Sequence, residues 1–238
     1  MVTASISTHC RSALSFGDSS IEFAKWIAFA LMLVDHVNAV FMDRQGGVAI
    51  EVLGRMAMPV FAFVLAYNLS RPSVNFQRVL RRLLLFGLVS MPAHAFLFGV
   101  VGPWPLNIMA TFAVSVAVIM FLRSGDRLSA IALFLVGSCL VEYWHAGTGL
   151  VVAFWLFLQG SRLGFPAIVA AFGALCLVNG NAWALFAFPL LHIVRLSPVA
   201  ISRSRWAFWM AYPLHLSVLA VLTLELVFFP SGSTFICK

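Results

Sequence analysis

Few residues of this chain carry a charge, and that scarcity excludes an ordinary soluble domain. Of 238 residues only 10% are Asp, Glu, Lys or Arg, whereas 62% are hydrophobic and the mean hydropathy is +1.01. Soluble domains carry about 25% charged residues and need less apolar material to fill a core. The composition therefore predicts a polytopic membrane protein with an all-α fold, a bundle of transmembrane helices.

Cysteine is scarce too, and several sequence signatures are missing. Cys10, Cys139, Cys176 and Cys237 lack the spacing of zinc or iron–sulfur sites, so we interpret them as unpaired packing or surface thiols. Residues 1–20 are polar and rich in Ser and Thr, unlike a secretory signal peptide. No period of self-similarity is visible, which disfavours the duplicated architecture of many transporters.

Apolar runs divide the chain into nine expected helices. About 20 residues, rising about 1.5 Å each, cross a hydrocarbon core of about 30 Å, and shorter runs are accepted where Gly and Pro intervene. The expected helices are 21–42, 55–70, 79–98, 105–122, 128–143, 147–160, 165–179, 181–195 and 206–229. They predict one transmembrane domain over 21–229, with a flexible cytoplasmic tail at 1–20 and a short tail at 230–238.

Basic residues fall unevenly between the loops on the two sides of these helices. Cytoplasmic loops of membrane proteins accumulate Lys and Arg. Twelve lie on the side of the N-terminus, namely Arg11, Lys25, Arg71, Arg78, Arg81, Arg82, Arg123, Arg127, Arg162, Arg195, Arg203 and Arg205. Three lie on the other side, namely Arg44, Arg55 and Lys238. We therefore expect a cytoplasmic N-terminus and, after nine crossings, an external C-terminus; the net charge of +7 indicates membrane orientation rather than nucleic-acid binding.

The first expected helix carries three polar side chains in "MLVDHVNAVF", residues 32–41. Asp35 lies about 22 Å from the cytoplasmic end of this helix, His36 follows it, and Asn38 shares nearly the same face. An ionisable side chain in the hydrocarbon region costs at least about 2.5 kcal/mol and is by default a functional-site hypothesis. These three residues are therefore candidate catalytic residues.

The second helix brings a cation to the same outer level. Arg55 lies in "GRMAMPVFAF", and because a short loop joins the two helices, we expect Arg55 to reach Asp35 or His36. This pairing would keep Asp35 ionised and fix the His36 tautomer, as a general base requires. A purely structural Asp–Arg pair between the helices is the alternative. His215, which follows Pro213 in the last helix, is either a further site residue or hydrogen-bonded to a neighbouring helix.

The cytoplasmic segment "RPSVNFQRVLRR", residues 71–82, concentrates positive charge. Its guanidinium groups are those of Arg71, Arg78, Arg81 and Arg82. One interpretation is a topology determinant that contacts anionic lipids. The other is a phosphate-binding rim, to which Asn68 would add a hydrogen-bond donor, because Arg binds phosphate in a bidentate manner.

Two classes of function fit these residues. One is a proton-coupled small-molecule transporter that uses Asp35 and His36 as a relay. The other is an enzyme that activates a nucleophile within the membrane. The absence of internal repeats and the separation of an outer base from an inner phosphate site favour the enzyme.

Four segments resemble a known family. "KWIAFALMLVDHVNAVF", "LGRMAMPVFAFVLAYNLSR", "LNIMATF" and "AYPLHLSVL" are similar to the TraX/TrbP-type membrane acetyltransferases of bacterial conjugation systems, which acetylate the N-terminus of processed pilin. The similarity covers about the first hundred residues, in order, and the last helix. It implies an enzyme of the bacterial inner membrane that takes an acetyl group from cytoplasmic acetyl-CoA. From the cysteine spacing and the distribution of arginines we expect neither a metal nor a nucleic-acid partner.

The resemblance also implies roles for the candidate residues. The acceptor would be the N-terminal amine of the pilin subunit precursor at the periplasmic face, with another amine or a hydroxyl as alternatives. The CoA phosphates would bind near Asn68, Arg71, Arg78, Arg81 and Arg82. His36, oriented by Asp35, would deprotonate the acceptor, and Arg55, Asn38 or His215 would stabilise the oxyanion.

Overall fold

Helices account for most of the backbone in the computed structural model, which describes residues 16–100, 104–199, 201–202, 204 and 206–228. Helices satisfy every backbone hydrogen bond internally, as an apolar surrounding requires. The α-helices are α2 (Asp18–Phe41), α3 (Val48–Leu69), α4 (Phe76–Phe98), α5 (Ile108–Ser124), α6 (Arg127–Gly137), α7 (Trp144–Leu158), α8 (Gly164–Asn179), α9 (Ala187–Leu196) and α10 (Ala207–Phe228). Two 3₁₀ helices, η1 (Ser138–Leu140) and η2 (Trp183–Phe186), precede α7 and α9.

Each expected helix corresponds to one α-helix of the described residues, so the all-α helical bundle is confirmed. The boundaries differ most at α3, which begins at Val48 rather than at residue 55. At the N-terminus, α2 already begins at Asp18, inside the expected tail, while 1–15 and the expected tail at 230–238 lie outside the described residues. The turn expected at 179–181 is present, since Gly180 ends α8 in the left-handed conformation.

The helices fall into two length classes. Four are long and apolar enough to cross a membrane, namely α2, α3, α4 and α10. The five helices between α4 and α10 are apolar but shorter than 18 residues. At about 1.5 Å per residue, α7 with its 15 residues extends about 22 Å, less than a hydrocarbon core of about 30 Å. The long helices are also those that carry the candidate site.

Side-chain caps set several helix boundaries. The Oδ1 atoms of Asn75, Asn107 and Asp126 accept hydrogen bonds from backbone N–H groups at the starts of α4, α5 and α6. Such caps satisfy backbone donors that the first turn leaves without a partner. Gly99 and Gly125 end α4 and α5 with positive φ, a conformation that glycine adopts without steric cost. The start and the end of α4 are thereby fixed by the local sequence.

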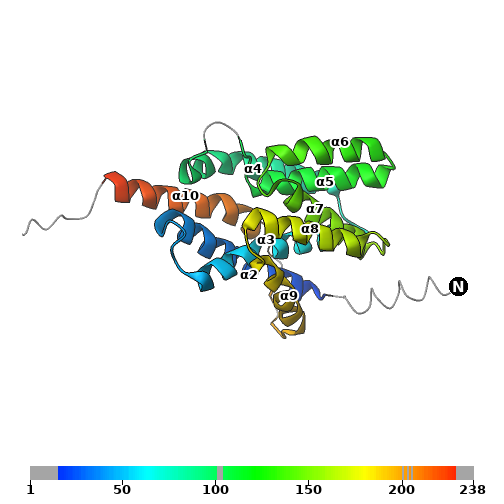
Figure 1. Ribbon diagram of the computed structural model, residues 1–238, viewed down its shortest axis with the longest axis horizontal. Helices are drawn as coiled ribbons and strands as arrows, with labels where there is room; N and C mark the ends of the chain where they lie inside the picture. Colours follow the sequence, from blue (N-terminus) through cyan, green and yellow to red (C-terminus); the bar gives the residue numbers. More distant parts are fainter. Residues whose placement is uncertain (1–15, 101–103, 200, 203, 205, 229–238) are drawn as a thin grey trace, which may run out of the picture.

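Helix α3 occupies the centre of the bundle (Figure 1). It packs against α2 on one side and against α7 and η2 on the other, while α10 packs against α4 and α2. Helices α5 and α6 run side by side at one flank, and α9 lies at the opposite one. The site residues of α2, α3, α4 and α10 therefore lie on helices that contact one another in the interior.

Gly54 in α3 allows α2 to approach closely at the level of the candidate site. A Cβ atom at this position would lie 2.5 Å from Oδ1 of Asp35 and 2.7 Å from its Cβ. A change of rotamer would move Oδ1 of Asp35 but not its Cβ, so no side chain fits there unless α2 and α3 move apart.

We therefore expect Gly54→Ala to lower the thermal unfolding temperature, because overpacking a well-packed interface costs about 1–3 kcal/mol. Gly173→Ala in α8 is the matched control, since a Cβ atom there meets nothing within 4 Å. Thermal unfolding in detergent compares the two. Equal melting temperatures for the two variants would contradict the tight α2–α3 contact.

Candidate active site

His36 and His215 meet where α2 crosses α10. His36 Nδ1 lies 2.9 Å from His215 Nε2, and the two rings are stacked with centroids 5.1 Å apart. His215 is 7% exposed, and its Nδ1 lies 3.0 Å from the carbonyl oxygen of Ala211, one turn earlier in α10. The structure thus brings together two residues that are 179 positions apart and that the sequence analysis named as separate candidates.

The carbonyl of Ala211 determines the tautomers of both neutral rings. A carbonyl oxygen only accepts, so Nδ1 of His215 carries the proton and its Nε2 holds a lone pair. That lone pair accepts the hydrogen bond from Nδ1–H of His36. The basic lone pair of His36 is then on Nε2. His215, with both nitrogens engaged, is a positioning residue rather than an oxyanion donor.

Asp35 has a different partner from the expected one. Its Oδ1 forms an ion pair with Nη1 of Arg44, in the α2–α3 loop, at 3.6 Å. The prediction that Asp35 orients His36 is wrong on this geometry, because consecutive helix residues point about 100° apart and His36 bonds to His215 instead. Arg55 directly follows Gly54, where α3 lies against Asp35. In the described residues, however, its Nε has no hydrogen-bond partner.

Asn38 holds the loop that carries Arg44. Its Oδ1 accepts a hydrogen bond from Gly46 N–H at 2.9 Å, and its backbone oxygen accepts one from Arg44 N–H at 2.9 Å. Asn38 is 2% exposed, so its amide is fixed inside the loop. We interpret Asn38 as a positioning residue for Arg44 and, through it, for Asp35.

A histidine–carboxylate pair lies beside the two stacked histidines. His94 in α4 is 2% exposed and its Nε2 lies 3.1 Å from Glu142 Oε1, in the connection between η1 and α7. The Phe98 ring contacts both His94 and His36, with centroid distances of 5.1 and 5.2 Å. Because Phe98 joins His94 to His36, the His94–Glu142 and Asp35–Arg44 pairs lie at the same end of the bundle, and we call these four residues the polar cluster.

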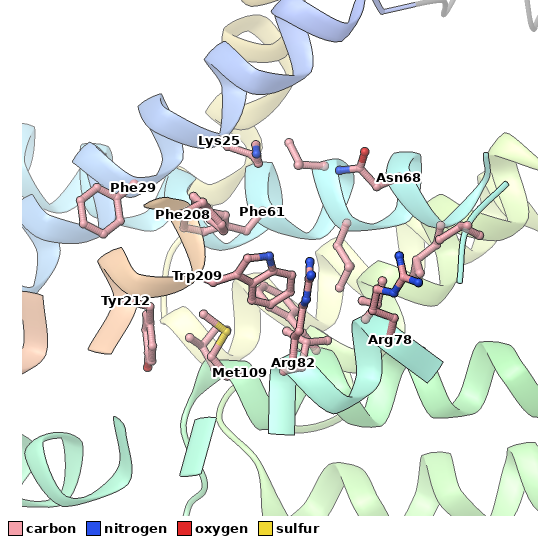
Figure 2. A pocket seen from close by; sticks show the side chains of 18 of the residues that line it. Lys25, Phe29, Phe61, Asn68, Arg78, Arg82, Met109, Phe208, Trp209 and Tyr212 are labelled. Atoms are coloured by element: carbon pink, nitrogen blue, oxygen red, sulfur yellow. The ribbon is translucent and has the colours of Figure 1, made fainter. Parts of the chain in front are cut away.

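A cavity of about 490 Å³ lies at the other end, between α2, α3, α4, α5 and α10. Its charged and amide-bearing lining residues are Lys25, Asn68, Arg71, Asn75, Arg78 and Arg82. None of the described lining residues is acidic. Figure 2 shows Asn68 and Arg78 at one end of the cavity and Phe29 and Tyr212 at the other. The basic end suits an anion, because Arg forms charge-assisted hydrogen bonds to phosphate.

The apolar end of the cavity reaches the histidine pair. The ring of Phe29 lies 5.4 Å from that of His215, and the ring of Tyr212 lies 5.3 Å from it, centroid to centroid. Lys25 precedes His36 by eleven residues in α2, which corresponds to about 16 Å along the helix axis. The cavity therefore connects a basic mouth to the neighbourhood of His36 across about half of a hydrocarbon core.

The arginines of the 71–82 segment are not equivalent. Arg82 lies over the rings of Trp206 and Trp209, at 4.7 and 5.8 Å from their centroids, and Trp209 also lines the cavity. Arg71 forms an ion pair with Asp18 at 2.6 Å. Arg81 is exposed and is not among the described residues of the cavity wall. The structure thus places Asn68, Arg71, Arg78 and Arg82 at one cavity and separates Arg81 from them.

Comparison with known proteins assigns the chain to a family. A family model described as "TraX protein" matches residues 20–223. Protein TraX from Escherichia coli is 30% identical over 240 residues, which cover 91% of this chain and 92% of that relative. The chain belongs to the TraX family. No solved structure matches it.

The match to the TraX family extends over both regions described above. Residues 20–223 include the histidine pair, the polar cluster around Asp35 and every residue that lines the cavity. In this TraX-family chain the sequence analysis did not assign site roles to Arg44, Glu142 or Trp209. Arg44 and Glu142 lie in connections between helices, where hydropathy gives no indication of the direction of a side chain.

Proposed function

We propose that this TraX-family protein is an acetyltransferase of the bacterial inner membrane that acts in conjugation. It transfers the acetyl group of cytoplasmic acetyl-CoA to the N-terminal amine of a processed pilin subunit at the periplasmic face. The observation that carries the proposal is the cavity that extends from a basic mouth to the residues in contact with His215. The distribution of basic residues supports a cytoplasmic location for that mouth.

The chemistry of the cavity suits the donor. Arg78, Arg82 and Asn68 supply donors for the phosphate groups of CoA, and Trp209 with Arg82 offers a stacking surface for its adenine. Further in, the wall consists of Phe29, Met32 and other apolar side chains, which suit a slender thioester arm. The arm would direct the acetyl carbonyl toward His36.

The reaction that we propose is direct transfer. The neutral acceptor amine attacks the thioester carbonyl carbon, and His36 Nε2 takes a proton from the attacking nitrogen. The new C–N bond forms, the C–S bond breaks, and the thiolate of CoA takes the proton back from His36. Arg55, which carries a buried N–H without a partner among the described residues, is the candidate for stabilising the oxyanion of the tetrahedral intermediate.

The role of His215 gives a prediction about tautomers. His215→Ala removes the acceptor for His36 Nδ1–H, and we expect the transfer rate to fall by about 10-fold, while His215→Gln, whose side-chain oxygen accepts, restores part of it. The pH–rate profile distinguishes a positioning role from a loss of folded protein. Unfolding lowers the rate at every pH, whereas a change in the proton affinity of His36 moves the midpoint of the profile. Equal rates and equal pH–rate profiles for the Ala and Gln variants would contradict the positioning of His36 by His215.

The experiment that tests the function uses the purified full-length protein. It is incubated in detergent with isotope-labelled acetyl-CoA and a peptide that carries the mature N-terminus of the cognate pilin. We expect label on the peptide α-amine and none when that amine is blocked. Proton-linked solute flux in liposomes, without acetyl transfer to any amine or hydroxyl, would overturn the proposal in favour of the transporter.

A further inference from the structure

A second cavity, of about 680 Å³, lies on the opposite side of α3 from the first, and we call it the aromatic groove. It is bounded by α3, α7, α8 and α9, and six phenylalanines from these helices line it: Phe63, Phe154, Phe157, Phe165, Phe172 and Phe188. Phe165 and Phe188 are 65% and 44% exposed, whereas Phe63, Phe154 and Phe172 are buried and form the floor. The groove is therefore open to the surroundings of the bundle rather than sealed within it.

The groove has one charged end. Among its described lining residues, His192 and Arg195 are the ones that can carry positive charge, and none is acidic. Both lie in the last two turns of α9, at the end of the bundle where the basic loops gather. Phe165, at the start of α8, belongs to the same end, whereas Cys176 near the end of α8 belongs to the other.

The length of the groove matches one leaflet. Phe165 and Cys176 are eleven residues apart in α8, or about 16 Å along its axis. Half of a hydrocarbon core measures about 15 Å. An acyl chain that enters beside Arg195 and extends toward Cys176 would therefore cover the phenylalanines over the depth of a single leaflet.

We propose that the aromatic groove binds one anionic phospholipid, with its acyl chain along the phenylalanines and its phosphate beside Arg195 and His192. Two features favour this occupant over a second copy of the chain. The cations lie at one end only, which complements a headgroup, and the apolar part has the depth of a leaflet. The site is separate from the cavity and the histidine pair, so it stands whether or not the protein is an acetyltransferase.

The test measures lipid binding by native mass spectrometry of the full-length protein in detergent. Phosphatidylglycerol and phosphatidylcholine with identical acyl chains are titrated separately. We expect one phosphatidylglycerol per monomer, bound about 10-fold more tightly than phosphatidylcholine. Both headgroups carry a phosphate, but phosphatidylcholine also carries a choline cation, which cancels its net charge and is repelled by Arg195. Equal affinity for the two lipids, or a dimer without lipid, would overturn the proposal.

Two pairs of variants localise the bound lipid. Gly173→Phe fills the groove, because Gly173 lines it and has no atom within 4 Å of a Cβ position, and we expect lipid binding to be lost. Ala170→Phe, on an exposed part of α8 outside the described groove lining, should bind as wild type. Arg195→Gln should remove the preference for phosphatidylglycerol, and Arg162→Gln should retain it. Lipid binding by Gly173→Phe at the wild-type level would contradict the site.

Discussion

His36→Ala is expected to lower the rate of acetyl transfer by about 100-fold or more, because a positioned general base contributes about 10²–10⁴ in rate. Binding of acetyl-CoA should stay unchanged, since His36 is not among the described residues that line the donor cavity. Single-turnover transfer of labelled acetyl groups measures the first effect, and equilibrium binding of acetyl-CoA measures the second. A loss of transfer with normal acetyl-CoA binding indicates a lost base, whereas a loss of both indicates a misfolded bundle.

The matched control for this change is His145→Ala. His145 lies at the start of α7, where Nε2 is 3.1 Å from the carbonyl oxygen of Leu135 and the ring contacts Phe134. Although Glu142 is only three residues away in the chain, these contacts of His145 involve no residue of the polar cluster, so we expect its variant to transfer acetyl groups at the wild-type rate. Wild-type transfer by His36→Ala would contradict the assignment of the base, whereas loss of CoA binding by that variant would indicate a structural role.

Removing the cations at the cavity mouth is expected to weaken the binding of the donor. We expect the double variant Arg78→Gln/Arg82→Gln to raise KM for acetyl-CoA by about 10–100-fold, because hydrogen bonds to charged groups contribute about 1.5–3 kcal/mol. The value of kcat should change little, since both arginines lie at the basic mouth and not at the histidine pair. Steady-state kinetics with varied acetyl-CoA give both quantities.

Arg81→Gln controls for charge. It removes a cation from the same helix, but Arg81 is exposed and lies outside the described cavity lining. A topology determinant or a site for anionic lipids would respond similarly to the loss of any of these arginines. A rise in KM for Arg81→Gln as large as that for Arg82→Gln would therefore contradict a phosphate site. Arg82→Lys should fall between wild type and Arg82→Gln, because Lys keeps the charge but not the bidentate fork.

The helices could be predicted from the sequence because hydropathy acts on whole segments. Nine apolar runs correspond to nine α-helices of the described residues, even where the runs are short. The start of α3 was placed too late because Glu51 interrupts the apolar run, yet Glu51 lies inside the helix and accepts a hydrogen bond from Asn181. Hydropathy therefore excluded Glu51 from the expected helix, although Asn181 satisfies its carboxylate in the folded protein.

The partners of the site residues were harder to predict, because they depend on how helices rotate against one another. Arg55 and Arg44 are both about level with Asp35, and the conformation of the loop around Asn38 brings Arg44 into contact. For the arginines, helical spacing was not decisive: relative to Arg78, Arg82 is rotated by about 40° and Arg81 by about 60° in the other direction, so both stay near the same face. The packing of α4 against α5 and α10 decides which of them lines the cavity.

The hydrogen bond between His36 and His215 also determines when the candidate site is completed during synthesis of the chain. It joins α2, the first described helix to leave the ribosome, to α10, the last. Until α10 has been inserted, His36 lacks its orienting partner, and the cavity lacks the wall that Phe208, Trp209 and Tyr212 provide. If the protein is the acetyltransferase that we propose, a nascent or truncated chain would not hold a thioester in position for attack by water before α10 is in place.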